Sequence, residues 1–222
     1  MRDSSLRSIA LRVVLLLTLP FFSCLVQATT ITELHFSEVV AKAQLVFEGR
    51  VTDVQAQQTG PRMINTLVTF KVIDVIKGQV EETTITLHYT GGRVGQRQLM
   101  IADMQIPEVG ETGVYFVSSL QNNLVHPLVG WSQGHFRVDE QSQSGNVSPE
   151  NRRIMTASGR PVSSLATARP DVDNTAPLPL LAPGAAARGV QVLGASQPEQ
   201  ALTVEAFKSG VRQILREQEG SQ

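Results

Sequence analysis

Cysteine is almost absent from this chain of 222 residues, which contains a single one, Cys24. With one cysteine the chain can form no internal disulfide bond, so a hydrophobic core must stabilise its fold. Aromatic residues make up only 5% of the sequence, which argues against a surface on which nucleic-acid bases stack. After residue 28 no apolar run approaches the roughly 20 residues that cross a membrane, so we expect no transmembrane span in the mature chain.

An excess of one charge is also missing. The net charge is −1, and it becomes −3 without the first 28 residues, which contain three arginines and one aspartate. This balance gives no basic surface for nucleic acid. The four histidines lack the spacing of a zinc motif, and no second cysteine is present to complete one. We therefore expect no nucleic-acid partner, no metal and no cofactor.

Residues 1–28 have the three zones of an export signal. A start with three arginines precedes an apolar run over 13–22, and small residues lead up to Ala28. This pattern predicts cleavage after Ala28 and a periplasmic or secreted mature protein. Cys24 leaves an alternative open, because lipidation there would anchor the protein to the cell envelope.

Alternating side chains predict a series of short strands after a short helix. The helix is expected over 36–43 with Ser37 as its N-cap. Strands are expected over 45–54, 67–78, 83–89, 98–102, 113–118, 124–129 and 134–139. The alternation slips near Ile73 and Asp74, which predicts a β-bulge there. The strands indicate one β domain over residues 29–140.

The composition changes after residue 140. Residues 141–162 form a polar extension that adds one strand, with a turn at Gly159, and residues 163–198 are rich in Ala, Pro and Gly and predict a linker. Residues 199–222 predict an amphipathic helix capped by Thr203, with Phe207, Val211 and Leu215 on its apolar face. Two roles stay open for this face: packing on the β domain, or docking to a partner.

Two strand motifs resemble those of a known family. They are Leu45-Val46-Phe47-Glu48-Gly49-Arg50-Val51 and Phe70-Lys71-Val72, the latter followed by Lys77-Gly78. They resemble the netrin-like, or tissue-inhibitor-of-metalloproteinase-like, OB-barrel family, and a group of exported bacterial proteins shares the layout. The resemblance implies an all-β fold, an OB-like antiparallel β-barrel with a short N-terminal helix and a separate C-terminal helix. Animal inhibitors of the family chelate zinc through an N-terminal cysteine; the expected N-terminus here is Thr29, so that mechanism is not implied.

The segment Gly130-Trp131-Ser132-Gln133-Gly134 matches the G-x-S-x-G motif of serine hydrolases. That chemistry requires a helix after the serine and a histidine later in the chain, but the last histidine, His135, directly follows the motif. A hydrolase centred on Ser132 is therefore the less favoured alternative. We interpret Trp131 as a residue at the core or the rim of the barrel and as a candidate binding residue.

The Gly-Gly-Arg-Val-Gly stretch at residues 91–95 lacks the Gly-Lys-Ser/Thr ending of a phosphate loop. We interpret it as a loop in which Arg93 and Arg97 contact an anionic partner. Together these patterns predict an exported, non-catalytic binding or accessory module that acts on another exported protein, with a protease among the candidates. The candidate binding residues are Arg93, Arg97, Trp131, Phe207, Val211 and Leu215.

Overall fold

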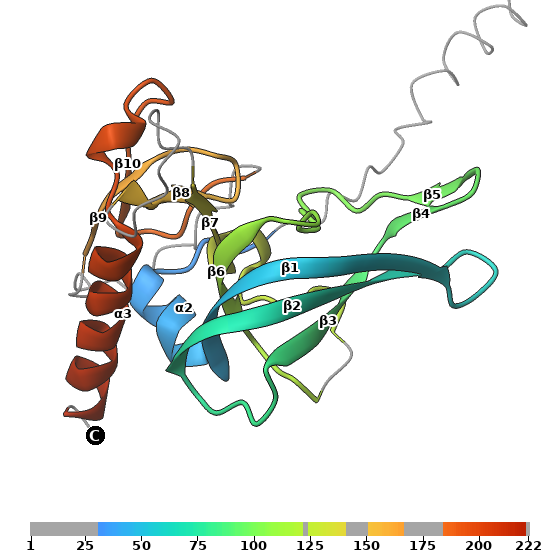
Figure 1. The fold of residues 1–222 in the computed structure, drawn as a ribbon, viewed down its shortest axis with the longest axis horizontal. Helices are drawn as coiled ribbons and strands as arrows, with labels where there is room; N and C mark the ends of the chain where they lie inside the picture. Colours follow the sequence, from blue (N-terminus) through green and yellow to red (C-terminus); the bar gives the residue numbers. More distant parts are fainter. Residues whose placement is uncertain (1–30, 122–123, 141–150, 167–183, 221–222) are drawn as a thin grey trace, which may run out of the picture.

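Six antiparallel strands form one sheet at the centre of the fold (Figure 1). The structure, a computed structural model, describes residues 31–121, 124–140, 151–166 and 184–220. The strand order is β3-β2-β1-β6-β7-β8, with β1 Leu45–Gln58, β2 Ile64–Lys77, β3 Thr84–Thr90, β6 Thr112–Val117, β7 His135–Asp139 and β8 Arg153–Thr156. Two small sheets pair β4 Gly92–Val94 with β5 Arg97–Leu99, and β9 Val162–Leu165 with β10 Val190–Val192. The helices are α2 Phe36–Lys42 and α3 Val204–Glu219, with short 3-10 turns η2 Trp131–Gly134 and η4 Pro198–Gln200.

The first two strands form a long hairpin that extends beyond the ranges predicted from the sequence. The predicted bulge is confirmed: Glu48 pairs with Asp74 and Gly49 with Val72, so Ile73 has no partner on β1. Such an extra residue bends the strand. The bulge leaves Asp74 directly opposite Glu48.

The expected mostly β, antiparallel fold with two helices is confirmed, but the sheet is open. Among the described residues no strand pairing joins β3 to β8, so these two strands are its edges. The strand predicted over 124–129 is wrong: that segment makes one isolated bridge, between Val117 and Leu128. Its Pro127 has no N–H to continue a ladder of hydrogen bonds.

Helix α2 begins at Phe36 as predicted, but its N-cap is His35 and not Ser37. The Nδ1 atom of His35 accepts from the backbone N–H of Ser37, and the backbone N–H of His35 donates to Glu38 at 2.9 Å. The two bonds satisfy free amides at the helix start. A histidine ring thus replaces the hydroxyl that the sequence suggested.

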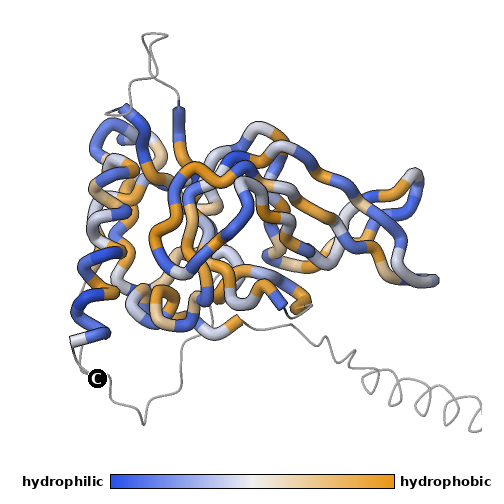
Figure 2. Tube along the Cα trace, turned by 60° about the horizontal axis from the view of Figure 1, so that its bottom comes forward, coloured by the Kyte–Doolittle hydropathy of each residue, from blue (hydrophilic) through white to orange (hydrophobic). Residues whose placement is uncertain are grey.

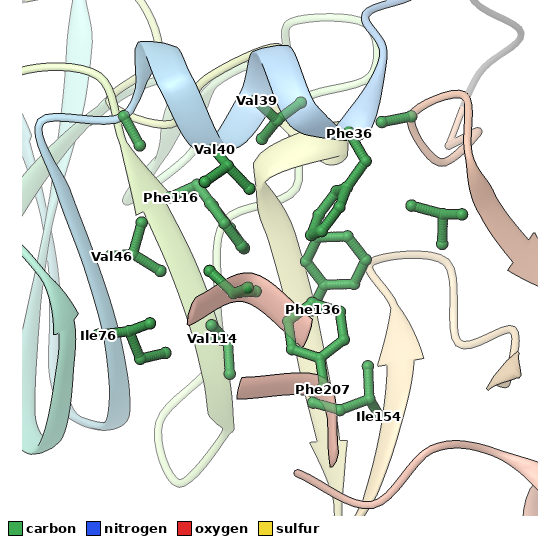
Figure 3. Close-up of a cluster of buried hydrophobic side chains, with 14 of the residues drawn as sticks. Phe36, Val39, Val40, Val46, Ile76, Val114, Phe116, Phe136, Ile154 and Phe207 are labelled. Carbon is green, nitrogen blue, oxygen red and sulfur yellow. The ribbon is translucent and has the colours of Figure 1, made fainter. Parts of the chain in front are cut away.

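Two hydrophobic clusters lie on opposite sides of the sheet. One packs α2 and α3 on the sheet around Phe36, Phe116, Phe136 and Phe207, whose rings converge (Figure 3). The ring centroids of Phe136 and Phe207 are 4.8 Å apart. The other cluster includes Phe47, Phe70 and Tyr115. The Phe47 ring lies against Gly49 because glycine has no side chain there; a Cβ on Gly49 would lie 2.6 Å from the ring.

The C-terminal helix packs on the β domain. Thr203 is its N-cap as predicted, accepting from the N–H of Ala206 at 3.1 Å. Phe207 and Val211 are fully buried and Leu215 is half-buried. Hydrophilic and hydrophobic residues alternate along the helix (Figure 2). The structure therefore favours packing over docking for its apolar face, and among the described residues no helix is long and apolar enough to cross a membrane.

The described parts of the expected extension and linker are ordered and belong to the same core. β8 joins the main sheet, and β9 pairs with β10. Val162, Ala187 and Val190 are buried in the cluster around the phenylalanines. Small side chains fill this part of the core. A segment rich in such residues has the same composition as a linker, so the two are alike in the sequence. Residues 141–150 and 167–183 lie outside the described residues.

A buried group of charges ties α3 to the sheet. The carboxylate of Glu48, fully buried in β1, accepts from Lys208 at 2.9 Å and from Arg152. Lys208 also donates to Asp74 at 3.0 Å and pairs with Glu205 at 2.6 Å. Burial alone would lower the pKa of the Lys208 ammonium, but its hydrogen bonds to the three carboxylates raise that pKa well above its usual value. Lys208 is therefore positively charged at neutral pH.

Replacing Lys208 with methionine tests this group of charges. The variant Lys208→Met leaves the buried Glu48 with one cation, and removing one partner of a buried pair typically costs about 3 kcal/mol. We expect the unfolding midpoint to fall by roughly 6–12 °C in a thermal melt. Lys71→Met, at an exposed position on β2, is the control and should change stability by less than about 0.5 kcal/mol. Equal midpoints for both variants would contradict the assignment.

Candidate functional site

A narrow projection of the sheet is the first candidate surface. It consists of residues 55–65, at the end of the β1–β2 hairpin, and residues 90–100, which carry β4 and β5; we call it the arm. The arm points away from α2 and α3 (Figure 1). Gly92 allows β4 to approach β2 closely, because a Cβ there would lie 2.2 Å from Thr66 Oγ1, and its φ of +125° suits glycine.

The arm is basic and carries exposed methionines. Its charged residues are Arg62, Arg93 and Arg97, and it contains no Asp or Glu. All three arginines are exposed, as are Met63 (48%) and Met100 (79%). Arginine and methionine are both enriched where proteins contact one another. The arm thus combines positive charge with adaptable apolar side chains.

The two arginines predicted from the sequence lie in one hairpin but on opposite faces of it. Arg93 pairs across the hairpin with Gln98, and Arg97 pairs with Val94. Neighbouring positions of a strand point to opposite faces, so the two side chains diverge. Arg97 donates to Gln58 of β1 at 3.1 Å. The predicted pair therefore surrounds the tip of the arm and does not form a single anion site.

Trp131 lies at the rim of the core in a left-handed backbone conformation. Its φ is +60°, which is costly for a large side chain. The half-buried indole stacks on His126 with a centroid distance of 5.4 Å, over a cavity of about 390 Å³ whose apolar wall includes Leu34, Leu124 and Leu128. Burial lowers the pKa of His126 to about 3. The tryptophan therefore covers a neutral histidine.

Ser132 does not occupy a nucleophile elbow. The serine lies in the 3-10 turn η2, between a loop and β7, and its Oγ donates to the backbone carbonyl of Ala185 at 3.4 Å. Within the described residues it forms no hydrogen bond to a histidine. The strand, serine and helix that this chemistry requires are not arranged here.

A cleft around Glu111 was not anticipated from the sequence. Glu111 accepts from His135 Nε2 at 2.8 Å and from the Tyr115 hydroxyl at 3.3 Å, and Arg137 lies 3.4 Å from its second oxygen. Glu111, His135 and Arg137 line a cavity of about 540 Å³, and Gln105 and Ser158 lie in its wall as well. An imidazole that a carboxylate orients in this way can accept a proton or pass one on.

The charge of Glu111 is stabilised by its neighbours. Burial by itself would raise the pKa of this carboxyl, but the hydrogen bond and charge of His135, with Arg137 and Tyr115, hold the pKa below its usual value. The sequence signal for the cleft was the alternation of His135 and Arg137 on one strand. This alternation does not reveal the cleft by itself, because the pairing of β6 with β7 is what places Tyr115 opposite His135.

Among the described residues, no three His, Cys, Asp or Glu side chains gather closely enough to hold a metal ion. Phe207, Val211 and Leu215, also predicted from the sequence, lie on the α3 face that packs on the sheet, and α3 lies away from the arm (Figure 1). No protein-family model, curated protein or solved structure matches the chain.

The neutral state of His126 predicts a loss of stability in weak acid. The folded-state pKa of about 3 lies below the usual value of about 6.5, so the unfolded chain binds the proton first as the pH falls. We expect His126 to lower the free energy of unfolding by about 2 kcal/mol between pH 7 and pH 5. Urea unfolding across this range measures the change.

The control for this titration is a histidine that is exposed. His126→Leu should flatten the pH dependence between pH 7 and pH 5, whereas His88→Leu, on the solvent-exposed side of β3, should leave it unchanged. An unaltered slope in the His126 variant would show that another group causes the loss.

Proposed function

We propose that the protein is an exported, non-catalytic binding module that contacts an acidic surface of another exported protein through its arm. The observation that carries this proposal is the absence of any Asp or Glu among 22 arm positions that hold three exposed arginines. The remainder of the mature chain is correspondingly acidic. Such a separation of charge steers an oppositely charged partner to one end of the molecule.

The neighbouring methionines give the arm its apolar contact area. The two methionines of the arm, Met63 and Met100, are both exposed to solvent. Their unbranched thioether side chains adapt to irregular surfaces. Arginines add directed hydrogen bonds to carboxylates. An exported protease with an acidic surface is one partner of this kind, in line with the family resemblance.

We propose that the sheet is an OB-like β-barrel left open between β3 and β8. Its support is the central place of β1, which pairs with β2 between Val46 and Gln58 and with β6 over Leu45 to Arg50. In this proposal α3, the C-terminal helix, is not separate from the barrel but covers one face of the sheet. The candidate partner surface then lies at the end of the barrel opposite α3 (Figure 1).

Export and anchoring rest on residues 1–30, which lie outside the described residues. We propose cleavage after Ala28. Mass spectrometry of the mature protein should give a chain that begins at Thr29; a lipidated chain that begins at Cys24 would replace the secreted module with an envelope-anchored one.

Reversing the charge of the arm tests the proposed function. The double variant Arg93→Glu/Arg97→Glu should lose the partner that the wild-type chain captures from an extract of exported proteins, because its carboxylates repel an acidic surface. Raising the salt concentration should also reduce the amount of partner that the wild-type chain captures, because salt screens the attraction between exposed charges.

The matched control reverses two exposed cations outside the arm. Lys71→Glu/Arg160→Glu makes the same change in net charge and should retain the partner. Loss of the partner in both double variants would mean that net charge, and not the arm, determines binding. Retention in both would remove the arm from the proposal.

A further inference from the structure

Strand β3 ends the main sheet with backbone groups that face solvent. The carbonyl of Thr83 accepts from Val72 on β2, so the odd-numbered residues of β3 turn their backbone groups toward β2. The N–H of Thr90 instead donates to the carbonyl of Val125, on the outer side. Because the direction alternates along a strand, Thr84, Thr86 and His88 direct their N–H and C=O groups outward.

None of the usual protections covers this edge. Residues 83–102 contain no Asp, Glu, Lys or Pro, and β3 has no bulge in its register with β2. Within the described residues, Val125 is the only one that bonds the outer side, at the end of the strand. Exposed edges of this kind normally carry a charge, a proline or a cover.

The opposite edge of the same sheet shows the contrast. On β8, the N–H of Ile154 donates to Leu202 and that of Thr156 donates to Arg160, so segments of the chain cover the edge. The short strand β5 carries the charged Arg97. The edge of β3 therefore differs from those of β8 and β5, because within the described residues it is neither covered along its length nor charged.

We infer that a second copy of the chain adds to this edge, with the two β3 strands antiparallel about a twofold axis at Thr86. In this register Thr86 pairs with Thr86 of the second copy, and Thr84 pairs with its His88. Each of the three outward residues then exchanges both backbone hydrogen bonds, as a closed twofold interface requires. The inference goes beyond the proposed function, since the pairing uses no residue of the arm.

The side chains are compatible with this register on both faces. Ile85 comes opposite Leu87 of the second copy on the face that is buried in each sheet, which extends the apolar surface across the junction. Threonines meet on the other face, and such cross-strand pairs are favourable. No like charges face each other, and Val125 lies beyond the paired residues. This self-complementarity is the reason for choosing a second copy as the occupant.

A lysine at the axis tests the pairing. In Thr86→Lys two ammonium groups would meet at the twofold axis, while in the monomer the side chain only adds charge to an exposed position. Sedimentation equilibrium at concentrations up to about 100 μM should show a wild-type dimer and a dissociation constant at least 100-fold higher for Thr86→Lys. The control Thr52→Lys, at an exposed position on β1, should dimerise like wild type.

Amide exchange locates the interface. The N–H groups of Thr84, Thr86 and His88 should exchange more slowly in concentrated than in dilute wild-type protein, and equally fast at both concentrations in Thr86→Lys. Equal thermal midpoints for Thr86→Lys and wild type, both measured at a concentration too low for dimerisation, show that the monomer stays folded. A monomeric wild type, a Thr86→Lys dimer, or a dimer with unprotected β3 amides would each overturn the inference. So would protection that requires an extract of exported proteins, because another protein would then supply the strand.

Discussion

The neutralisation of the Glu48 carboxylate is the constraint on which the rest of the structure depends. Glu48 lies in the middle of β1 with no exposure to solvent, and an unpaired carboxylate there costs several kcal/mol. Its cations, Arg152 and Lys208, come from chain segments more than 100 residues away. The sheet can therefore bury β1 on this side only after the C-terminal third of the chain has returned to it.

The same contacts determine how α3 lies on the sheet. Its apolar face alone would allow the helix to slide or turn over a surface of phenylalanines and valines. The ion pairs from Lys208 to Glu48 and Asp74, and from Arg212 to Asp74 at 2.9 Å, stabilise the helix in its observed position. The bulge at Ile73 is part of this arrangement, because strict alternation from Val72 through Ile73 would point Asp74 to the other face of β2.

The sequence predicts most accurately the features that depend on neighbouring residues. The three long strands, the bulge at Ile73 and the Thr203 cap follow from alternation and local hydrogen bonding. Glu48 alternates with Phe47 and Gly49, a pattern that indicates a polar, outward face for this side chain. That face is in fact buried, since α3 covers it, and no local pattern reveals a cover that is 160 positions away.

For a related reason, the sequence does not reveal that residues beyond 140 belong to the same core as the strands before them. The strands β9 and β10 are four and three residues long, too short for an alternating pattern. Their neighbours are small residues such as Ala187, which are common in linkers and in tightly packed cores. The cleft at Glu111 likewise depends on the pairing of β6 with β7, whereas Arg93 and Arg97 stand out in the sequence because their surroundings contain no acid.

The distribution of ion pairs separates the body of the protein from the arm. In the body, Glu48, Asp74, Glu111, Glu140 and Glu205 each pair with a cation of the same chain. In the described part of the arm, by contrast, no arginine pairs with a carboxylate. Single exposed ion pairs contribute little to binding, but cations without internal competitors retain their full attraction for an external anion. The ion pairs of the body thus hold the C-terminal helix in place, whereas the positive charge of the arm is not balanced by any carboxylate of the arm itself.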